Sequence, residues 1–300
     1  MKKLICIAAL IGAASGTAGA AEVAGESSFH LLTNRCESES HEGPETTPQS
    51  PPLNVDDPST PGCNAWEINV VVDGDFTRAQ NSFELPLLDI NYGIGDNLQL
   101  KYELPYLSNQ ADGTTSAAVG ESKAGIKFMF FEDETSKLQL AAYPQLTFVS
   151  SRADVVAKGL ASPGNIFTLP VLMAFKIGQT LRGDVDLTAN LGYNISTKSD
   201  VGNFISASLG VGTPIFRNVS IMGELATEQA MSAIGDEARS QVLKADIGMV
   251  GTLSRQFLLF GALGHSLSAS DALEHSYGLI GFRLLSSINS SDPRVASAQP

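Results

Sequence analysis

Residues Gly264 to Ser268, in the order Gly-His-Ser-Leu-Ser, come nearest of any segment to a hydrolytic nucleophile. A serine nucleophile of the elbow type needs glycine at both ends of such a pentapeptide and a strand–turn–helix setting. Ser268 occupies the last position instead, and His265 and Ser266 point to opposite faces of an alternating segment. The pattern therefore does not predict a catalytic pair.

Two carboxylates, Asp184 and Asp186, could act as a general acid and base, but their spacing also places them on one strand face beside Arg182. The glycine pairs at 93–95 and 210–212 lack the third glycine and the following helix of a phosphate-binding loop. The histidines show no metal-ligand spacing; they are His30, His41, His265 and His275. We therefore expect no enzyme activity, no metal and no cofactor.

The segment from Leu181 to Ser196 changes polarity at almost every residue, which indicates a β-strand with one apolar and one polar face. The segment is far longer than the usual strand of about 5–6 residues in a soluble sheet. A tilted membrane-spanning strand needs about 9–11 residues and can project beyond the bilayer. The length therefore favours a membrane-spanning strand.

Similar segments recur over residues 65–286 and predict an all-β fold, a 12-stranded antiparallel transmembrane β-barrel of the outer-membrane type. The expected strands are 65–73, 82–93, 97–107, 119–131, 137–150, 165–177, 180–196, 203–213, 217–229, 239–252, 255–267 and 275–286. Tight linkers alternate with longer ones near 74–81, 108–118, 151–164, 197–202, 230–238 and 268–274. This alternation is typical of short periplasmic turns and longer outer loops, and it places both chain ends in the periplasm. A soluble sandwich would show shorter strands and no such alternation.

Residues 1–20 predict a secretory signal peptide, because Lys2 and Lys3 precede an apolar run to about Ala14 that is followed by small residues. The apolar run is too short for a transmembrane helix, which needs about 20 residues. The formal charge of −13 becomes −15 without the two lysines, which argues against a nucleic-acid partner. We expect an exported outer-membrane protein whose partners are lipid, a small solute and the barrel-assembly machinery.

Residues 21–64 are expected to form a disordered periplasmic arm. The stretch 37–62 is rich in Pro, Ser, Thr and acidic residues and almost devoid of apolar ones. Cys36 and Cys63 flank this stretch and could form a disulfide in an oxidising compartment, with two free thiols as the alternative. Residues 287–300 are expected to form a flexible tail.

Strand parity assigns the polar side chains to the barrel interior, because a barrel of this size turns its apolar side chains to lipid. The predicted lumen-lining residues are Asp89, Lys101, Glu103, Glu121, Lys123, Lys127, Arg182, Asp184, Asp186, Glu224, Glu228, Lys244, Asp246 and Arg283. This mixture of acids and bases could fill and rigidify a narrow barrel, or it could line a wet pore. Aromatic residues near strand ends are expected at the membrane interfaces; they are Tyr102, Tyr106, Phe130, Phe148, Tyr193 and Phe282.

Trp66-Glu67, Pro86-Leu87-Leu88-Asp89 and Tyr92-Gly93-Ile94 resemble the start of the barrel in a family of bacterial outer-membrane channels. That family is labelled "putative MetA pathway of phenol degradation" or simply transporter. The resemblance is specific over residues 65–106 and implies a 12-stranded barrel and a role in the passage of aromatic compounds. It supplies no substrate-contacting residues. One departure is that a tail follows Phe282, whereas such barrels usually end on an aromatic residue that the insertion machinery recognises.

The leading hypothesis is a passive outer-membrane channel or transporter for small solutes, with a polar lumen. One alternative is a closed structural or surface-interaction barrel whose outer loops bind a partner. A second alternative is a lipid-modifying barrel enzyme that depends on His265 or Ser266. Ion conductance separates the first hypothesis from the closed barrel, and lipase activity would single out the enzyme.

Overall fold

A computed structural model describes residues 27–29, 36, 55–133, 135–149, 152–161, 163–198, 201–231, 241–268 and 275–287. The elements are β1 (Ser27–Phe29), β2 (Ala65–Thr77), β3 (Gln80–Ile94), β4 (Leu98–Ala111), β5 (Thr114–Val119), β6 (Glu121–Asp133), β7 (Leu138–Ala142), β8 (Gln145–Val149), α1 (Arg152–Ala157), β9 (Ile166–Thr180), β10 (Gly183–Ser196), β11 (Phe204–Phe216), β12 (Val219–Ala230), β13 (Gln241–Ser254), β14 (Phe257–Ser268) and β15 (His275–Ser287). Within these ranges no helix is long and apolar enough to cross a membrane. The expected signal peptide lies outside the described residues.

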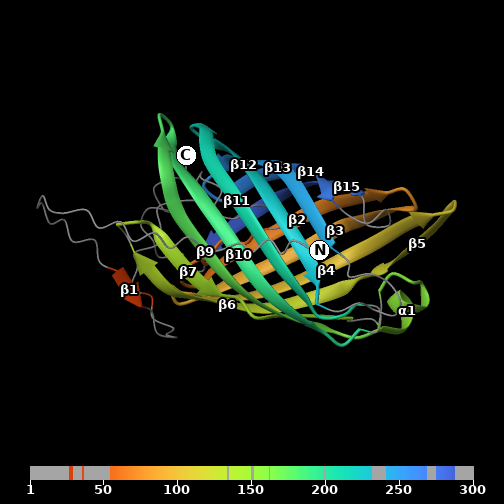
Figure 1. Cartoon of the computed structure of the whole chain (residues 1–300). Coiled ribbons are helices and arrows are strands. Elements are labelled where there is room, and N and C mark those ends of the chain that lie inside the picture. The colour runs from red at the N-terminus through yellow and green to blue at the C-terminus, as the bar shows by residue number, and fades with distance from the viewer. Residues whose placement is uncertain are drawn as a thin grey trace, which may run out of the picture.

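The strands form a closed antiparallel barrel (Figure 1). We call each position around the barrel a stave, whether one strand or two short strands in line occupy it. β5 and β6 share one stave, β7 and β8 share another, and β2 to β15 therefore make twelve staves. Gly120 separates β5 from β6, and its N–H donates to the carbonyl of Pro105 at 2.8 Å. Tyr143 and Pro144 separate β7 from β8, and the Tyr143 N–H donates to the carbonyl of Pro170 at 3.0 Å. Each interrupted stave therefore stays bonded to its neighbour, and the predicted 12-stranded antiparallel barrel is confirmed.

The barrel closes where β15 pairs with β2, from His275 opposite Thr77 to Ser287 opposite Ala65. Ala65 and Ser287 lie at the end of the barrel with the tight connections, which we call the turn end; these connections are 95–97, 134–137, 181–182, 217–218 and 255–256. We call the opposite end the loop end. The barrel extends one residue beyond the predicted limit of 286, and residues 288–300 of the expected tail lie outside the described residues.

Two of the longer linkers expected at the loop end are absent, which corrects the prediction for 74–81 and 108–118. β2 and β3 continue to a connection at 78–79, and β4 and β5 continue to a connection at 112–113. Asp112 and Gly113 have φ values of 51° and 73°, as a type I′ hairpin turn requires. The Asp-Gly pair is therefore the centre of a strand-extending hairpin instead of part of a loop.

The predicted arm does not extend to residue 64. Ser27–Phe29 pairs with the end of β6, and residues 55–64 are packed against the barrel. Val55, Asp57 and Pro58 are almost completely buried. The remainder of the predicted arm, apart from Cys36, lies outside the described residues.

Candidate functional site

Each stave presents one polar and one apolar face. On β4, Gln99 is buried and Lys101 is half-buried, whereas Leu100 and Tyr102 between and after them are exposed. Because the barrel is closed, the polar face lines the interior and the apolar face forms the outer wall. The exposed apolar residues at mid-strand include Ile126, Val171, Leu191, Leu225, Ile247, Leu263 and Ile280. This arrangement is that of a barrel whose outer wall contacts lipid.

Thirteen of the fourteen predicted lumen residues lie on the inner face by strand register. They are Asp89, Lys101, Glu103, Glu121, Lys123, Lys127, Asp184, Asp186, Glu224, Glu228, Lys244, Asp246 and Arg283. Arg182 differs: it lies exposed in the turn between β9 and β10, with its guanidinium 5.4 Å from the ring centre of Phe216. Arg182 belongs to the two-residue turn 181–182, which is outside the hydrogen-bonded strands, so the alternation of inward and outward side chains does not apply to it.

A chain of ion pairs runs around one half of the inner wall. Glu103 lies 2.5 Å from the Nζ atom of Lys101 and 3.0 Å from that of Lys123. The same Lys101 Nζ lies 3.8 Å from Asp89. The side chains of Asp89, Lys101 and Glu103 are only 10–16% exposed, so each charge is satisfied by its neighbours as well as by any water in the lumen.

The chain of ion pairs continues across the closing strands. The Asn69 amide donates to Asp89 at 2.9 Å and to Glu67 at 3.0 Å. Arg283 donates from Nε to the Asn69 amide oxygen at 2.8 Å, and it lies 3.3 Å from Glu67. Three carboxylates (Glu67, Asp89 and Glu103) and three cations (Arg283, Lys101 and Lys123) are thus linked along β15, β2, β3, β4 and β6, so the charges within this network balance.

The inner wall of β12 to β2 carries an acidic row. Glu224, Asp246, Gly264, Tyr277 and Asp75 are successive register partners on five adjacent staves. The Tyr277 hydroxyl reaches across Gly264 and donates to Asp246 at 3.0 Å. The lumen therefore holds two distinct electrostatic features, a charge-balanced network of ion pairs and a row whose members include three carboxylates and no cation.

Residues 55–60, which we call the inner segment, lie inside the barrel against β6 and β10. The Asp56 N–H donates to the Asn190 side-chain oxygen, and the Asn190 amide donates back to the Asp56 carbonyl, both at 2.7 Å. Lys127 donates from Nζ to the carbonyls of Asp57 at 2.7 Å and Ser59 at 3.0 Å. Asn190 and Lys127 both point inward, so the inner segment occupies part of the lumen.

A buried cluster on β6, the β7–β8 stave and β9 lies beside the inner segment. It consists of Met129, Ala141, Tyr143 and Leu172, of which the last three are fully buried. The Lys127 ammonium lies 5.0 Å from the centre of the Tyr143 ring, which places a cation–π contact between the cluster and the lysine that holds the inner segment. The packing of the buried cluster and the hydrogen bonds from Lys127 to the inner segment thus lie on the same side of the lumen.

The chain leaves the lumen at the turn end before entering β2. The Thr60 hydroxyl donates to the Asp96 carbonyl at 2.8 Å, in the turn between β3 and β4. A Cβ atom at Gly93 would lie 1.8 Å from the Gly62 carbonyl oxygen, so this close approach needs glycine. Cys63 follows and is joined to Cys36 in a disulfide with Cα atoms 5.5 Å apart.

The loop end is covered in part by α1 and the residues after it. Val155 is fully buried against Ala118 of β5 and Val149 of β8, with Leu160 packed on the same cluster. Beside it, the Lys198 ammonium lies 2.5 Å from the inward Glu121 carboxylate. Residues 155–161 therefore lie over the β5–β8 side of the barrel mouth, and α1 lies near the hairpin of β4 and β5 in Figure 1.

On the described staves, seven inward acidic, basic or histidine residues were absent from the predicted set; they are Glu67, Asp73, Asp75, Glu84, Glu132, Lys176 and His275. Alternation alone would have found Glu67, Asp73 and Asp75, which share the parity of the inward Asn69. Glu84 has the opposite parity to Asp89, and it turns inward because a register shift separates Glu84 from Leu87. No alternation rule reveals that bulge.

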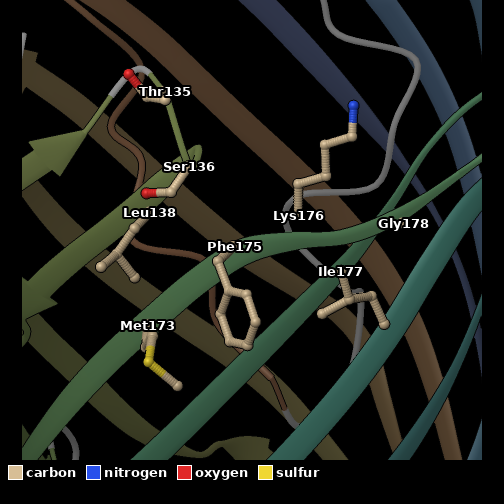
Figure 2. Close-up of a pocket in the computed structure, with 8 residues that line it drawn as sticks. All are labelled: Thr135, Ser136, Leu138, Met173, Phe175, Lys176, Ile177 and Gly178. Atoms are coloured by element: carbon tan, nitrogen blue, oxygen red, sulfur yellow. The ribbon is translucent and has the colours of Figure 1, made fainter. Parts of the chain in front are cut away.

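The outer wall has a shallow apolar groove near the turn end, between the β6–β7 connection and the last part of β9 (Figure 2). Met173, Phe175 and Ile177 line it together with Leu138, whereas Lys176 points to the other face. Lys176 lies 2.6 Å from Asp184 on the inner wall. The alternation of outer apolar and inner charged side chains thus persists along β9 to the register shift that follows Lys176.

His265 and Ser266 face opposite sides of β14 and cannot act together. His265 is exposed and lies 3.0 Å from the Ser276 hydroxyl, whereas Ser266 is buried and accepts a hydrogen bond from the His275 N–H at 2.9 Å. The expectation that the two residues point apart is confirmed.

No family model and no curated protein matches the chain in sequence. Among solved structures, an outer membrane channel from Pseudomonas putida F1 aligns with a TM-score of 0.58 and 14% identity, over 79% of this chain and 99% of that one. The NanC porin aligns with a TM-score of 0.51 and 9% identity, over 72% of this chain and 98% of that one. The chain therefore has the fold of outer-membrane channels and porins, and the phenol-degradation label rests on the sequence resemblance alone.

Proposed function

We propose that the protein is an outer-membrane channel for the passive passage of small solutes. The observation that carries the proposal is the charged inner wall, in which Glu67, Asp89 and Glu103 each lie within 3.8 Å of a cation, inside an apolar outer wall. Charged side chains in a dry interior cost several kcal/mol each, about 3 or more, unless they are paired and hydrated. A water-filled path along this wall removes much of that cost.

The channel would be inserted with its turn end in the periplasm. Export by the predicted signal peptide and insertion by the barrel-assembly machinery belong to the same proposal. Aromatic compounds are proposed as solutes on the strength of the resemblance at Trp66-Glu67 and Pro86–Asp89. Passage does not require bond making or breaking, so no cofactor is invoked.

Planar-bilayer recording of the refolded protein tests the proposal. We expect discrete, salt-dependent conductance steps from protein whose gel mobility changes on heating, as folded barrels show. The heat-unfolded sample should give no steps. Liposome swelling with graded sugars and with a phenolic solute measures which solutes pass, and a phenolic solute no faster than a sugar of equal size would remove the aromatic preference.

A closed structural barrel is the second candidate, because the inner segment occupies part of the lumen and Val55 and Pro58 are buried. A refolded barrel with the expected heat-dependent mobility, but no conductance and no swelling with any solute, would support this candidate and overturn the channel proposal.

A further inference from the structure

We propose that the inner segment, residues 55–60, is the constriction that sets the size limit of the channel. This inference rests on the proposed function and assigns a specificity role to one piece of the chain.

The dimensions make this segment the narrowing element. Twelve strands about 4.8 Å apart and tilted by about 40° give a backbone diameter of about 24 Å. Inward side chains of about 6 Å on each wall leave an opening of about 12 Å, and a second backbone layer packs about 10 Å from the wall it covers. A chain segment lying on the inner wall therefore removes roughly half of the remaining width.

Two inward side chains hold the segment by its backbone. The Asn190 amide exchanges two hydrogen bonds with Asp56, in the manner of a strand partner. The Lys127 ammonium binds the carbonyls of Asp57 and Ser59. Because a buried peptide group needs a partner, these contacts allow a segment with few apolar residues to remain against the wall.

The segment is also shaped by its own residues. The Ser59 N–H donates to the Asp57 carboxylate at 2.8 Å, and the Ser59 hydroxyl contacts the same carboxylate. Pro58 between them is fully buried and has a fixed φ. The Asp57 carboxylate thus stabilises a local turn, and this turn holds the segment in one conformation inside the lumen.

The lower end of the segment is fastened at the turn end. Thr60 bonds the Asp96 carbonyl, Gly62 touches Gly93, and Cys63 carries the disulfide to Cys36. Release of the contacts at Asn190 and Lys127 would therefore free the part of the segment that lies in the lumen while its base stays attached.

The first experiment measures the size limit. The double variant Asn190→Ala with Lys127→Met should raise the single-channel conductance several-fold and admit larger sugars in liposome swelling than the parent does. Lys127→Arg keeps donors for the two carbonyls and should stay close to the parent. Asn218→Ala and Lys137→Met change the same residue types in turns outside the lumen and should leave both readouts within about twofold of the parent, as expected for surface sites.

The second experiment follows the segment directly and does not depend on conductance. Val55 is 1% exposed, so Val55→Cys should react slowly with a membrane-impermeant maleimide in folded protein. In the Asn190→Ala background the rate should rise about tenfold, the factor expected from the loss of one or two hydrogen bonds.

The outcomes separate the two proposals. Fast labelling of Val55→Cys in the parent would show that the segment is not seated and would overturn the inference, whatever the conductance. Slow labelling with an unchanged size limit in the released double variant would overturn the inference and leave the channel proposal standing. Absence of conductance in parent and released variants alike would overturn the channel proposal itself.

Discussion

Tyr277 on β15 and Asp246 on β13 are joined across the strand that separates them, with the phenolic hydroxyl donating to the carboxylate at 3.0 Å. The ring can cross β14 only because residue 264 is glycine. A Cβ atom there would lie 2.2 Å from the Tyr277 Cζ atom. The glycine that begins the Gly-His-Ser-Leu-Ser segment therefore serves packing inside the barrel.

Gly264→Ala should destabilise the barrel by about 1–3 kcal/mol, since the displaced ring leaves its site and the Asp246 carboxylate loses a donor. Urea unfolding in detergent, followed by tryptophan fluorescence or circular dichroism, measures the change. Gly223→Ala is the matched control, because its nearest neighbour to a new Cβ lies 3.9 Å away. Equal effects of the two substitutions would contradict the packing role.

Two ion pairs of the inner wall should differ in their contribution to the unfolding free energy, because one is more buried than the other. Lys101→Met removes a cation shared by Glu103 and Asp89, where the three side chains are 10–16% exposed, and the loss of this charge between two buried carboxylates should cost about 2–4 kcal/mol of unfolding free energy. Lys176→Met removes the partner of Asp184, where both are 32–35% exposed, and should cost less than about 1 kcal/mol. Chemical unfolding of both variants gives the comparison, and a larger loss for Lys176→Met would refute it.

The alternation of polar and apolar residues was sufficient to predict the staves, since each stave must present one face to lipid and the opposite face to the lumen. The rule held for Leu181–Ser196, where β10 begins at Gly183, and it placed Asp184 and Asp186 inside. It failed where the ladder is irregular. Arg182 lies in a turn and Glu84 lies beyond a bulge, and neither position follows from counting residues.

The inner segment could not have been predicted from its composition. Residues 55–60 have the Pro, Ser and Asp content of a disordered linker, and local sequence gives them nothing to pack on. Their partners are Lys127 and Asn190, which lie 68–70 and 134 residues away along the chain. The barrel has to exist before this segment has anything to bind.

A charged side chain on the outer wall should destabilise the barrel most at the middle of a stave. Leu263 is 70% exposed in the middle of β14, and Leu263→Arg should cost about 2–4 kcal/mol in lipid vesicles, as arginine does at the bilayer midplane. Leu181→Arg places the same side chain in the turn between β9 and β10, where the expected cost falls to about 0–1 kcal/mol. Unfolding in vesicles measures both, and equal costs would show that β14 does not face lipid.

The disulfide between Cys36 and Cys63 gives a prediction that depends on no transport assay. Mature protein unfolded without reductant should contain no titratable thiol, and reduction should reveal two, because Cys6 lies within the predicted signal peptide. The single variant Cys36→Ser should expose one thiol in every condition. In the chain-entropy model, closing a loop of this size is worth about 3–4 kcal/mol, and the loop contains Val55 but none of the staves, which begin at Ala65. The double variant Cys36→Ser with Cys63→Ser should therefore keep the heat-dependent gel mobility of the folded barrel while labelling of Val55→Cys accelerates. Two free thiols in the unreduced mature protein would contradict the bond, and a lost mobility shift would show that the barrel itself depends on it.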